Sequence, residues 1–581
     1  MRPTIIGRQH AVSCGHYLAT AAAMRVLERG GNAVDAGVTA AMALSVLQPN
    51  VVSFAGVAPT LIYLREEDRV VSLAGLGYWP AATDASILAA KGNGCIPDGL
   101  LQTVMPAAPA THVKALQRYG TITFEEAATP AYQLAKDGFS VYPMLAYNIE
   151  RVTLSPSKLD EIPIGFDRYP ENARIFLPKG RPPKTGDIFR QEDLARTIHG
   201  MIEAERNAKG DRSTKLRAVH DFFYKGPIAD AIVKYHVENA GFVRKDDLAG
   251  FEVPIESSIS CSYRGLRVHT CDVWCQGVVL LEALKILECF DLKRFRHNSL
   301  AYIHTLAEAM NLAFSDRESY VGDPKFVDVP TAGMLSDEYA LLQHNKINPS
   351  KAFGAMPPPG DPWAILGRIS GKPVVPKPAS REQFAIEKDT IYTCVVDRFG
   401  NAYSGTPSDN VYDTPIIPGT GLAISSRGNQ SRLQPGHPAE VRPGKRPRLT
   451  PSPALAFKDG KFYFAFGTPG GDVQTQAMLQ VLLNVYEFGM TVQAAVEAPR
   501  FGTFNFPNSF SPNQYLPGRL CVESGVLDDV RTGLREAGHD VEDWPAYAPP
   551  AGGVCAIKAD HETATLHAGA DPRREGYAMA W

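Results

Sequence analysis

A strand, a glycine-rich turn and a helix follow one another late in the chain, and this arrangement restricts the fold more than any other feature. Residues 461–466 read as a strand, residues 467–472 form a Gly-Thr-Pro-Gly-Gly-Asp turn, and a long helix is expected over residues 474–488. Paired glycines before a helix let backbone N–H groups approach an anion, and the helix dipole adds a favourable potential. The turn therefore suits a phosphate or an oxyanion, or is only a tight connection. No Gly-Lys-Ser/Thr follows, which argues against a nucleotide-binding loop.

Helices and strands are both expected along the chain, which indicates a mixed α/β fold. Helices are predicted over residues 17–28, 33–47, 278–287 and 301–314, and strands within residues 51–64, 390–396 and 402–404. The helix at 33–47 consists almost entirely of small and apolar residues, so we expect it to be buried on most sides.

A threonine stands where a proline-rich segment meets a predicted strand. Residues 351–380 are rich in proline and glycine, so we expect residues 351–389 to form a mobile segment. Asp389 and Thr390 follow, and Thr390 begins the strand. Threonine is common in strands, so this junction is informative only in combination with other features.

The composition excludes several classes of protein. Hydrophobic residues make up 44% and charged residues 21% of the 581 residues, which rules out wholesale disorder. Lys+Arg 59 and Asp+Glu 62 leave a net charge of −3, so no global positive field favours nucleic acid or an anionic membrane. No window approaches the about 20 apolar residues of a membrane span. Charged residues interrupt any longer apolar run around residues 11–27, which favours a mature helix over a signal peptide.

The nine cysteines are irregularly spaced and odd in number. A chain of this length buries an adequate core without disulfides, so we expect a reducing compartment and a cytoplasmic location. His269, Cys271 and Cys275 have no second paired ligand cluster nearby, so core packing is the preferred interpretation. We therefore expect neither a metal nor another cofactor.

Several segments, in order along nearly the whole chain, resemble the γ-glutamyltranspeptidase family. Residues 30–36 (Gly-Gly-Asn-Ala-Val-Asp-Ala) resemble its N-terminal signature. Residues 390–397 with 400–402 resemble its nucleophile strand, and residues 469–471 (Pro-Gly-Gly) resemble its oxyanion loop. Supporting matches lie at residues 277–284, 304–330, 445–447 and 571–573. The combination is far more specific than any single motif.

The resemblance implies an N-terminal-nucleophile hydrolase with a four-layer αββα sandwich. In such a family a precursor cuts itself before a threonine, here between Asp389 and Thr390. Residues 1–389 would form the large subunit and residues 390–581 the small subunit, which carries the nucleophile. The two subunits are expected to stay associated, because the nucleophile strand belongs to a shared sheet.

Cleavage before Thr390 is chemically reasonable. A threonine hydroxyl is a poor nucleophile and needs an adjacent base. Cleavage frees an α-amino group on the same residue, with a pKa of about 7.7–8.0. This amine can accept the hydroxyl proton directly or through one water. The β-branched side chain also restricts χ1, so the hydroxyl is oriented in advance.

The resemblance also implies roles for four further residues. Ser408 aligns with a second hydroxyl residue that hydrogen-bonds the nucleophile, and Asn410 lies where the family places an Asn near the substrate. Gly470 and Gly471 would donate backbone N–H groups to the tetrahedral oxyanion. Without the wider match, residues 407–410 would be interpreted as a solvated turn.

The departures from the family pattern concern the substrate. Transpeptidases of the family hold the γ-glutamyl α-carboxylate with an Arg and a Ser-Ser pair. Residues 94–114 contain no Arg, and the Ser-Ser pair falls near Leu449-Thr450, so Thr450 supplies only one hydroxyl. Arg427 occupies a position often held by Gln or Asn. It can bind a carboxylate bidentately, or it is a surface turn residue.

These departures favour hydrolysis of a small amide through an acyl-enzyme on Thr390, as in the cephalosporin-acylase-like branch of the family. A γ-glutamyltransferase or glutathione hydrolase is the alternative. An uncleaved relative that binds a ligand without catalysis is a third hypothesis from a different class. The expected partner is a small-molecule amide, and the sequence leaves the oligomeric state open, so that a homo-oligomer is compatible with it.

Overall fold

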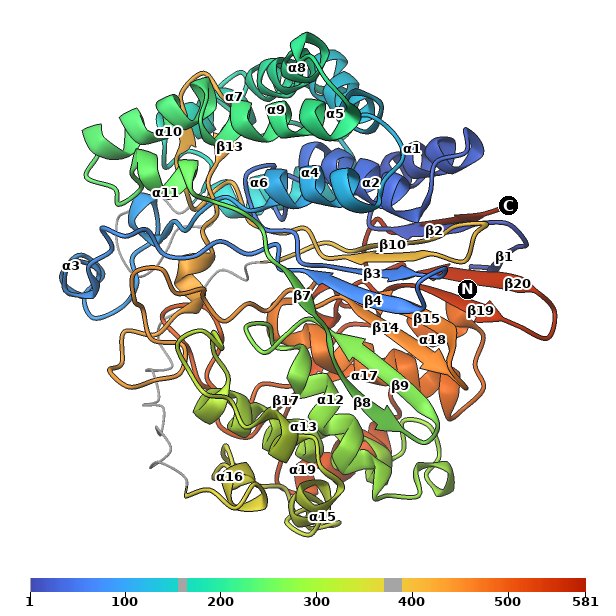
Figure 1. The fold of residues 1–581 in the computed structure, drawn as a ribbon. Coiled ribbons are helices and arrows are strands. Elements are labelled where there is room, and N and C mark those ends of the chain that lie inside the picture. The colour runs from blue at the N-terminus through green and yellow to red at the C-terminus, as the bar shows by residue number, and fades with distance from the viewer. Residues whose placement is uncertain (1, 155–164, 370–388) are drawn as a thin grey trace.

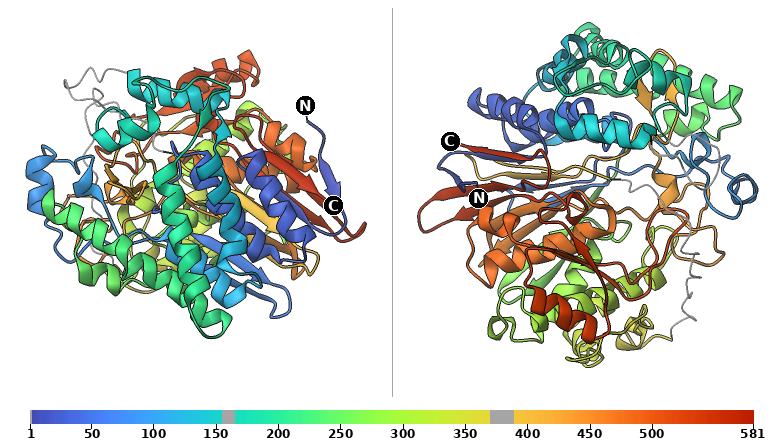
Figure 2. Two further views of the ribbon diagram at one scale, coloured as in Figure 1. Left: turned by 90° about the horizontal axis from the view of Figure 1, so that it is seen from above. Right: turned by 180° about the vertical axis from the view of Figure 1, so that it is seen from behind.

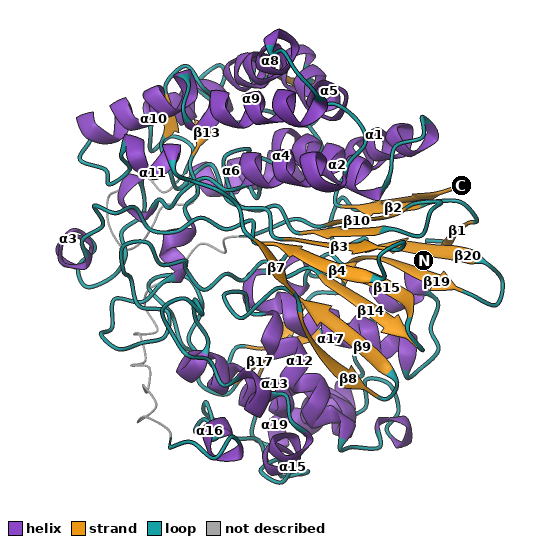
Figure 3. Ribbon diagram, in the orientation of Figure 1, coloured by secondary structure: helices purple, strands orange, loops and turns teal. Residues whose placement is uncertain are grey.

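The fold consists of two central sheets covered on each outer side by helices, a four-layer αββα arrangement (Figure 1, Figure 3). It was determined as a computed structural model, which describes residues 2–154, 165–369 and 389–581. The expected mixed α/β class and the layered architecture are both confirmed.

The first sheet has seven strands and carries the residues around Thr390. All its neighbouring strands are antiparallel. Their order is β21 (Tyr577–Ala580), β2 (Ala11–Cys14), β10 (Thr393–Val396), β11 (Ala402–Gly405), β3 (Thr60–Leu64), β4 (Arg69–Leu73) and β7 (Ile255–Ser257). Strands β2 and β21, from the first and last parts of the chain, thus lie next to each other on one side of β10.

The second sheet also has seven antiparallel strands. Their order is β1 (Ile5–Gly7), β20 (Thr565–Ala570), β19 (Cys555–Asp560), β15 (Lys461–Gly467), β14 (Ala454–Lys458), β9 (Leu266–Thr270) and β8 (Ile259–Tyr263). The glycine-rich turn follows the last residue of β15, the central strand, so the turn lies at the middle of the sheet edge. Figure 2 shows that the two chain termini lie near each other at one edge of the sheets.

Side chains that alternate along the strands pack into three cores: one under the helices on each outer face, and one between the two sheets. On β10, Val395 faces the helices of the first layer, whereas Cys394 and Val396 face the second sheet. There they join Leu455 and Ile557 in a cluster between the sheets. Successive side chains of a strand point to opposite faces, so each β strand here supports two cores at once. Cys394 is fully buried.

The outer helices bury the remaining faces of the sheets. The first sheet is covered by α1 (Tyr17–Glu28), α2 (Ala33–Leu47), α4 (Ala108–Tyr119), α5 (Phe124–Asp137), α8 (Glu192–Asn207) and α9 (Arg212–Tyr224). The second is covered by α12 (Gly277–Glu288), α13 (Leu300–Tyr320), α17 (Gln474–Tyr486) and α18 (Val492–Glu497). Helices α2, α5 and α8 contact one another in turn, so the first covering layer is itself more than one helix deep.

Shorter elements complete the described chain. The helices are α3 (Ala85–Lys91), α6 (Pro143–Leu154), α7 (Pro170–Phe176), α10 (Pro227–Glu238), α11 (Lys245–Ala249), α14 (Thr331–Met334), α15 (Asp337–His344), α16 (Pro362–Ile365) and α19 (Asp528–Glu536). The strands are β5 (Phe139–Ser140), β6 (Ile188–Phe189), β12 (Ile416–Ile417), β13 (Leu422–Ala423), β16 (Phe501–Thr503), β17 (Arg519–Glu523) and β18 (Asp540–Trp544). Within the described residues, no helix combines the length and the apolar character that a membrane crossing requires.

Helix α2 begins within residues 30–36 and packs on the β10–β11 hairpin. Asn32 caps the helix, and Asp35 accepts a hydrogen bond from the Asn32 backbone in return, which forms a capping box. At Gly37 an added Cβ would lie 2.3 Å from the ring of Tyr403 on β11. The glycine therefore lets α2 lie directly on the β10–β11 hairpin, and all fifteen helix residues are buried.

The proline-rich segment differs from its prediction. Its first part is folded: α16 forms within it, and the Gly360 N–H donates to Asp316. The Met356 N–H likewise donates to the Tyr515 hydroxyl. Hydrogen bonds to buried partners compensate here for a composition that favours an irregular chain. Residues 370–388, the remainder of the predicted mobile segment apart from Asp389, lie outside the described residues.

Candidate active site

Thr390 lies buried just before β10, in contact with the loop that follows β11. The two residues Thr390 and Ser408 form an isolated antiparallel bridge. Their hydroxyl oxygens, Thr390 Oγ1 and Ser408 Oγ, are 2.7 Å apart, and Thr390 is only 1% exposed. The structure therefore brings together the two hydroxyl groups that lie 18 residues apart in sequence. The strand itself begins three residues later than expected, at Thr393.

The carbonyl oxygen of the peptide bond between Asp389 and Thr390 has two donors. Arg427 Nη2 donates to the Asp389 carbonyl at 2.8 Å, and Ser408 Oγ donates to the same oxygen at 3.1 Å. Arg427 Nη2 also bonds to Ser408 Oγ. Because Ser408 has a single hydroxyl proton and gives it to the carbonyl, its bond with Thr390 must use the Thr390 proton. The hydroxyl of Thr390 is thereby oriented beside a polarised carbonyl.

Arg427 is fully buried, which excludes the surface-turn alternative. It lies in a short 3-10 turn, Arg427–Gln430, with its guanidinium over the ring of Phe510. Its Nε is 3.4 Å from Asp409 Oδ1. The hydroxyl groups of Ser425 and Ser426 also donate to the Asp409 carboxylate. This network fixes the guanidinium next to the bond between Asp389 and Thr390.

Asp409 is the buried counter-charge of Arg427. Burial raises the pKa of its carboxyl group, and Arg427 acts in the opposite direction. Asp409 also has a φ of 111°, an uncommon conformation for a residue other than glycine. Its place between Ser408 and Asn410 means that this backbone conformation helps to direct both neighbouring side chains.

The glycine-rich turn presents a backbone N–H group to the same place. Gly470 has a φ of 122° and Gly471 a φ of 54°, in the left-handed region that glycine tolerates. The Gly470 N–H donates to Asp389 Oδ1 at 2.7 Å. The Gly471 carbonyl accepts a hydrogen bond from Gln276 Nε2 at 3.0 Å. The turn is therefore anchored from α12 while its amide faces the residue before Thr390.

Asp389 itself occupies these donors with its side chain. Oδ1 accepts hydrogen bonds from the backbone N–H groups of Thr390, at 2.8 Å, and Gly470. Oδ2 forms an ion pair with Arg574 Nη2 at 2.6 Å. The carbonyl and the carboxylate of one residue thus lie in two different sets of donors.

The remaining predicted site residues lie at different distances from Thr390. Asn410 Oδ1 accepts a long hydrogen bond, 3.4 Å, from the Asp389 N–H, and its Nδ2 has no partner among the described residues. Thr450 instead receives a hydrogen bond from Gln430 Nε2 at 2.7 Å, and in the described structure no hydrogen bond joins it to Thr390 or Asp389. Asn410 therefore contacts Asp389 directly, whereas Thr450 bonds to Gln430 instead.

Three polar residues of the site were missed by the sequence reasoning. Gln474 Nε2 lies 3.5 Å from Thr390 Oγ1, Gln276 supports the glycine-rich turn, and Arg574 binds Asp389. Gln474 was recognisable as the first residue of the helix after that turn. Gln276 and Arg574 have no comparable local signal, because each reaches the site from a distant part of the chain.

A cavity of about 200 Å³ opens beside Asp389. Its described lining residues come from the first part of the chain and from four later segments: Asn50, Val51, Met144, Tyr147, Asn148, Arg151, Val152, Asp389, Tyr412, Pro549, Pro550 and Arg574. Asp389 is the acidic residue of this lining, while Arg151 and Arg574 are basic. Asp389, the residue before Thr390, therefore borders a small pocket of mixed polarity.

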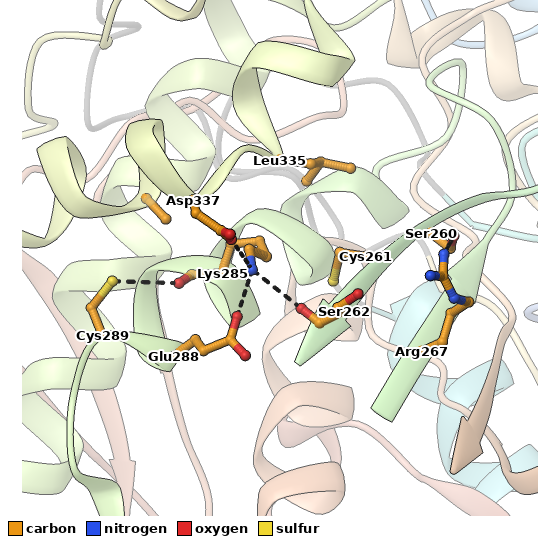
Figure 4. A pocket seen from close by; sticks show the side chains of 10 residues that line it. Ser260, Cys261, Ser262, Arg267, Lys285, Glu288, Cys289, Leu335 and Asp337 are labelled. Carbon is orange, nitrogen blue, oxygen red and sulfur yellow. Dashed lines mark hydrogen bonds and ion pairs between the residues drawn. The ribbon is translucent and has the colours of Figure 1, made fainter. Parts of the chain in front are cut away.

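A second pocket, of about 490 Å³, has a different character (Figure 4). It lies among β8, β9, α12 and α15, and at its centre Lys285 forms ion pairs with both Glu288 and Asp337. Burial raises the pKa of Cys261 in its wall to about 12, so this thiol is not ionised near neutral pH. The charged groups here neutralise one another, and we assign the chemistry to the site around Thr390.

In residues 2–154, 165–369 and 389–581, no three His, Cys, Asp or Glu side chains are grouped so that they could hold an ion. Cys275 Sγ contacts the carbonyl of Pro451 at 3.0 Å within the core. His269 accepts or donates a hydrogen bond with Ser258 and packs on Phe457.

An αββα sandwich with a buried threonine at the head of a central strand is the architecture of the N-terminal-nucleophile hydrolases. Residues 19–581 match the family model described as gamma-glutamyltranspeptidase. The chain belongs to this family.

Similar proteins include both hydrolases of glutathione and acylases. The chain is 30% identical to a glutathione hydrolase proenzyme of Bacillus subtilis (strain 168), over 99% of this chain and 92% of the relative. It is 29% identical to the acylase ACY 1 proenzyme of Pseudomonas sp. (strain SE83), over 99% of this chain and 94% of the relative. The crystal structure of cephalosporin acylase from Bacillus halodurans superposes with a TM-score of 0.84 at 27% identity, covering 100% of this chain and 97% of that one. Both sequence relatives are proenzymes, so the family membership agrees with a precursor that is processed.

Proposed function

We propose that this chain is the precursor of a threonine amidohydrolase. It cuts its own bond between Asp389 and Thr390 and then hydrolyses a small amide through an acyl-enzyme on Thr390. The products of the first reaction are a large subunit, residues 1–389, and a small subunit, residues 390–581. The observation that carries this proposal is the buried pair of hydroxyl groups, 2.7 Å apart, beside a carbonyl that accepts hydrogen bonds from Arg427 and Ser408.

Self-cleavage begins with attack of Thr390 Oγ1 on the carbonyl carbon of Asp389. Negative charge develops on the carbonyl oxygen, where the Arg427 guanidinium and the Ser408 hydroxyl stabilise it. The bond from this carbon to the Thr390 nitrogen breaks, and the nitrogen takes up the proton that the hydroxyl loses. Asp389 is then held as an ester on Thr390, and water hydrolyses the ester to a carboxylic acid and the free hydroxyl.

The mature site uses the groups that this reaction releases. The new α-amino group of Thr390 accepts the proton of its own hydroxyl during attack on a substrate amide. Departure of Asp389 frees the Gly470 N–H, which with Gly471 stabilises the substrate oxyanion. The leaving amine takes its proton from the Thr390 ammonium, and water or an acceptor amine releases the acyl group.

Glutathione hydrolysis or γ-glutamyl transfer is the alternative function, and one observation favours it: the 30% identity with glutathione hydrolase proenzymes. Against it stands Thr450, which bonds to Gln430 and supplies a single hydroxyl where transpeptidases have two. A binding protein without catalysis is the weaker hypothesis, because it gives no reason for two hydroxyl groups and a guanidinium to surround one peptide carbonyl.

Two measurements test the proposal. On a denaturing gel, active protein is expected to give two chains, the smaller one beginning at Thr390. A panel of γ-glutamyl, succinyl, glutaryl, oxamyl and aryl amides then identifies the acyl group. Strong preference for γ-glutamyl amides would favour the alternative, and one uncut chain without amidase activity would support the binding protein.

A further inference from the structure

The uncut chain holds a carboxylate in the place where a substrate has to bind. The Asp389 carboxylate links the Gly470 N–H, an oxyanion donor of the proposed mature enzyme, to the guanidinium of Arg574. The two oxygens of one carboxylate reach both donors, at 2.7 and 2.6 Å. Arg574 and the oxyanion donor are therefore close neighbours, separated by little more than a carboxyl group.

Arg574 is built into this position rather than loosely exposed. Its Nε donates to the carbonyl of Pro549 at 3.1 Å, which leaves Nη2 directed to Asp389. An added Cβ at Gly553 would lie 2.3 Å from Arg574 Cγ, so the glycine makes room for the side chain. The side chain is 13% exposed. A guanidinium held in this way is well suited to bind a carboxylate.

Self-cleavage changes the charge of this site. Asp389 becomes the last residue of the large subunit, and it must leave before a substrate can reach Thr390. Among the described residues that line the cavity, Asp389 alone is acidic, whereas Arg151 and Arg574 are basic. When Asp389 departs, the cavity therefore keeps two positive charges, and the low exposure of the Arg574 side chain, 13%, strengthens its attraction for an anion.

We propose that Arg574 selects an acyl group that carries a carboxylate, and that Asp389 occupies this carboxylate site until the chain is cut. The inference rests on the proposed function and adds the specificity-determining residue. One carboxylate spans the Gly470 N–H and Arg574, whereas a substrate has to place its carbonyl oxygen at Gly470 and its carboxylate at Arg574. These two groups must therefore be separated by only a short chain, as in a succinyl group. The short monoamide of a dicarboxylic acid is the class of substrate that follows.

The test compares two substrates that differ only in the terminal group of the acyl chain, a carboxylate or a methyl group. Succinyl p-nitroanilide and butyryl p-nitroanilide have acyl chains of equal length, and the wild-type enzyme is expected to prefer the succinyl compound. Arg574→Met keeps the apolar stem beside Gly553 and removes the charge. We expect kcat/KM for the succinyl substrate to fall about 10- to 100-fold, the usual effect of losing a charge-assisted hydrogen bond, and that for the butyryl substrate to change less than about threefold.

Three further variants control this result. Arg574→Lys keeps the charge and should recover part of the succinyl activity. Arg69→Met removes an exposed arginine of β4 that is paired with Glu67 and should change neither substrate. If Arg574→Met cuts itself slowly because Asp389 has lost its partner, Asp389→Asn/Arg574→Met removes the unpaired carboxylate as well. Equal losses for both substrates, or no loss for either, in a cleaved and active enzyme contradict the inference while leaving the proposed function intact.

A binding measurement tests the occupied state separately and needs no Arg574 variant. Succinate is titrated into cleaved wild-type protein, into uncut Thr390→Ala, and into uncut Asp389→Gly/Thr390→Ala, which lacks the side chain that fills the site. We expect binding to the first, and at least about tenfold weaker binding to Thr390→Ala, because Asp389 fills the site. Binding should return in the double variant. Equal affinity of cleaved protein and uncut Thr390→Ala would show that Asp389 does not occupy the succinate site. Absence of cleavage in the wild type would instead overturn the proposed function.

Discussion

Two sets of donors meet at Asp389, and they differ in composition and burial. The carbonyl oxygen faces side-chain donors, Arg427 and Ser408, both fully buried. The carboxylate faces a backbone amide, Gly470, and Arg574, which borders a cavity. A buried set enclosed by protein suits a reaction performed once on the chain itself, whereas a set beside a cavity suits repeated exchange of ligands. The same nucleophile can therefore serve both reactions with different partners.

The largest effect is expected from the nucleophile, which both sets share. Thr390→Ala should give an uncut chain without amidase activity, because no hydroxyl remains to attack either carbonyl. The protein should stay folded, since the change removes one methyl and one hydroxyl group at a position outside the regular strand. A denaturing gel, an amidase assay and circular dichroism measure the three properties. Cleavage at the same bond in this variant would exclude Thr390 as the processing nucleophile.

The carbonyl set is tested by Arg427→Met. We expect self-cleavage to slow about 10²- to 10³-fold, as when an oxyanion donor is removed from other enzymes. The rate is measured by following the uncut chain on gels over time. Arg427→Lys keeps the charge but not the forked geometry, so its rate of self-cleavage should lie between those of the wild type and Arg427→Met.

Loss of Arg427 also leaves the buried Asp409 carboxylate without its partner, which can destabilise the fold by about 3–5 kcal/mol. Asp409→Asn/Arg427→Met removes both charges and separates this effect from catalysis. If the double variant cuts itself at the wild-type rate, the guanidinium has no role in self-cleavage.

The carboxylate set is tested by Gly470→Ala. The φ of 122° at this residue is unfavourable for alanine, although the nearest atom to the added Cβ is 3.5 Å away. The turn should therefore rearrange and displace the N–H group, at a cost of about 1–3 kcal/mol. Amidase activity should fall about 10-fold to 100-fold, in proportion to that cost. Self-cleavage, which uses Arg427 and Ser408, should slow much less. Equal losses in both reactions would show that the two donor sets do not serve separate reactions.

The smallest effect is a difference in pH dependence between the two reactions. In the mature enzyme the Thr390 amine must be unprotonated to act as the base, so kcat/KM should rise with pH and level off above about 7.7–8.0. Below that range, activity should fall about tenfold for each pH unit. The uncut chain has no such amine, so the rate of self-cleavage should not show this rise with pH. Rates of both reactions between pH 5.5 and pH 9, values chosen to bracket the amine pKa of about 7.7–8.0, make the comparison. The same rise with pH in the rates of both reactions would argue against the amine as the base.

Local patterns were sufficient to predict individual elements and the mixed α/β class, whereas the resemblance to a known family implied the four layers and the roles of the site residues. The capped helix at residues 33–47, the strand with alternating faces before residue 397 and the glycine-rich turn are each encoded within a short segment, and the structure has all three. Thr390, Ser408 and Gly470 meet because the hairpin and the turn fix them. The resemblance to a known family supplied the order of these parts.

Other features depend on contacts that no local pattern records. Arg427 was expected to bind the carboxylate of a substrate, but in the uncut chain it donates to the Asp389 carbonyl. Asp409 and Phe510, which position it, come from two other loops. Arg574 follows the matched residues 571–573, yet only the fold shows that it reaches Asp389. The prediction for residues 351–369 was wrong for a related reason, since their partners lie in α13 and in the loop near Tyr515.

The most direct test of the account is the N-terminal sequence of the smaller chain in active protein. Purified precursor is incubated until amidase activity reaches its maximum, and the fragments are sequenced and weighed by mass spectrometry. The account predicts a small chain that begins Thr-Ile-Tyr-Thr, at Thr390, and that appears in parallel with activity. Full activity in a single unbroken chain, or a small chain beginning at any other residue, would contradict it.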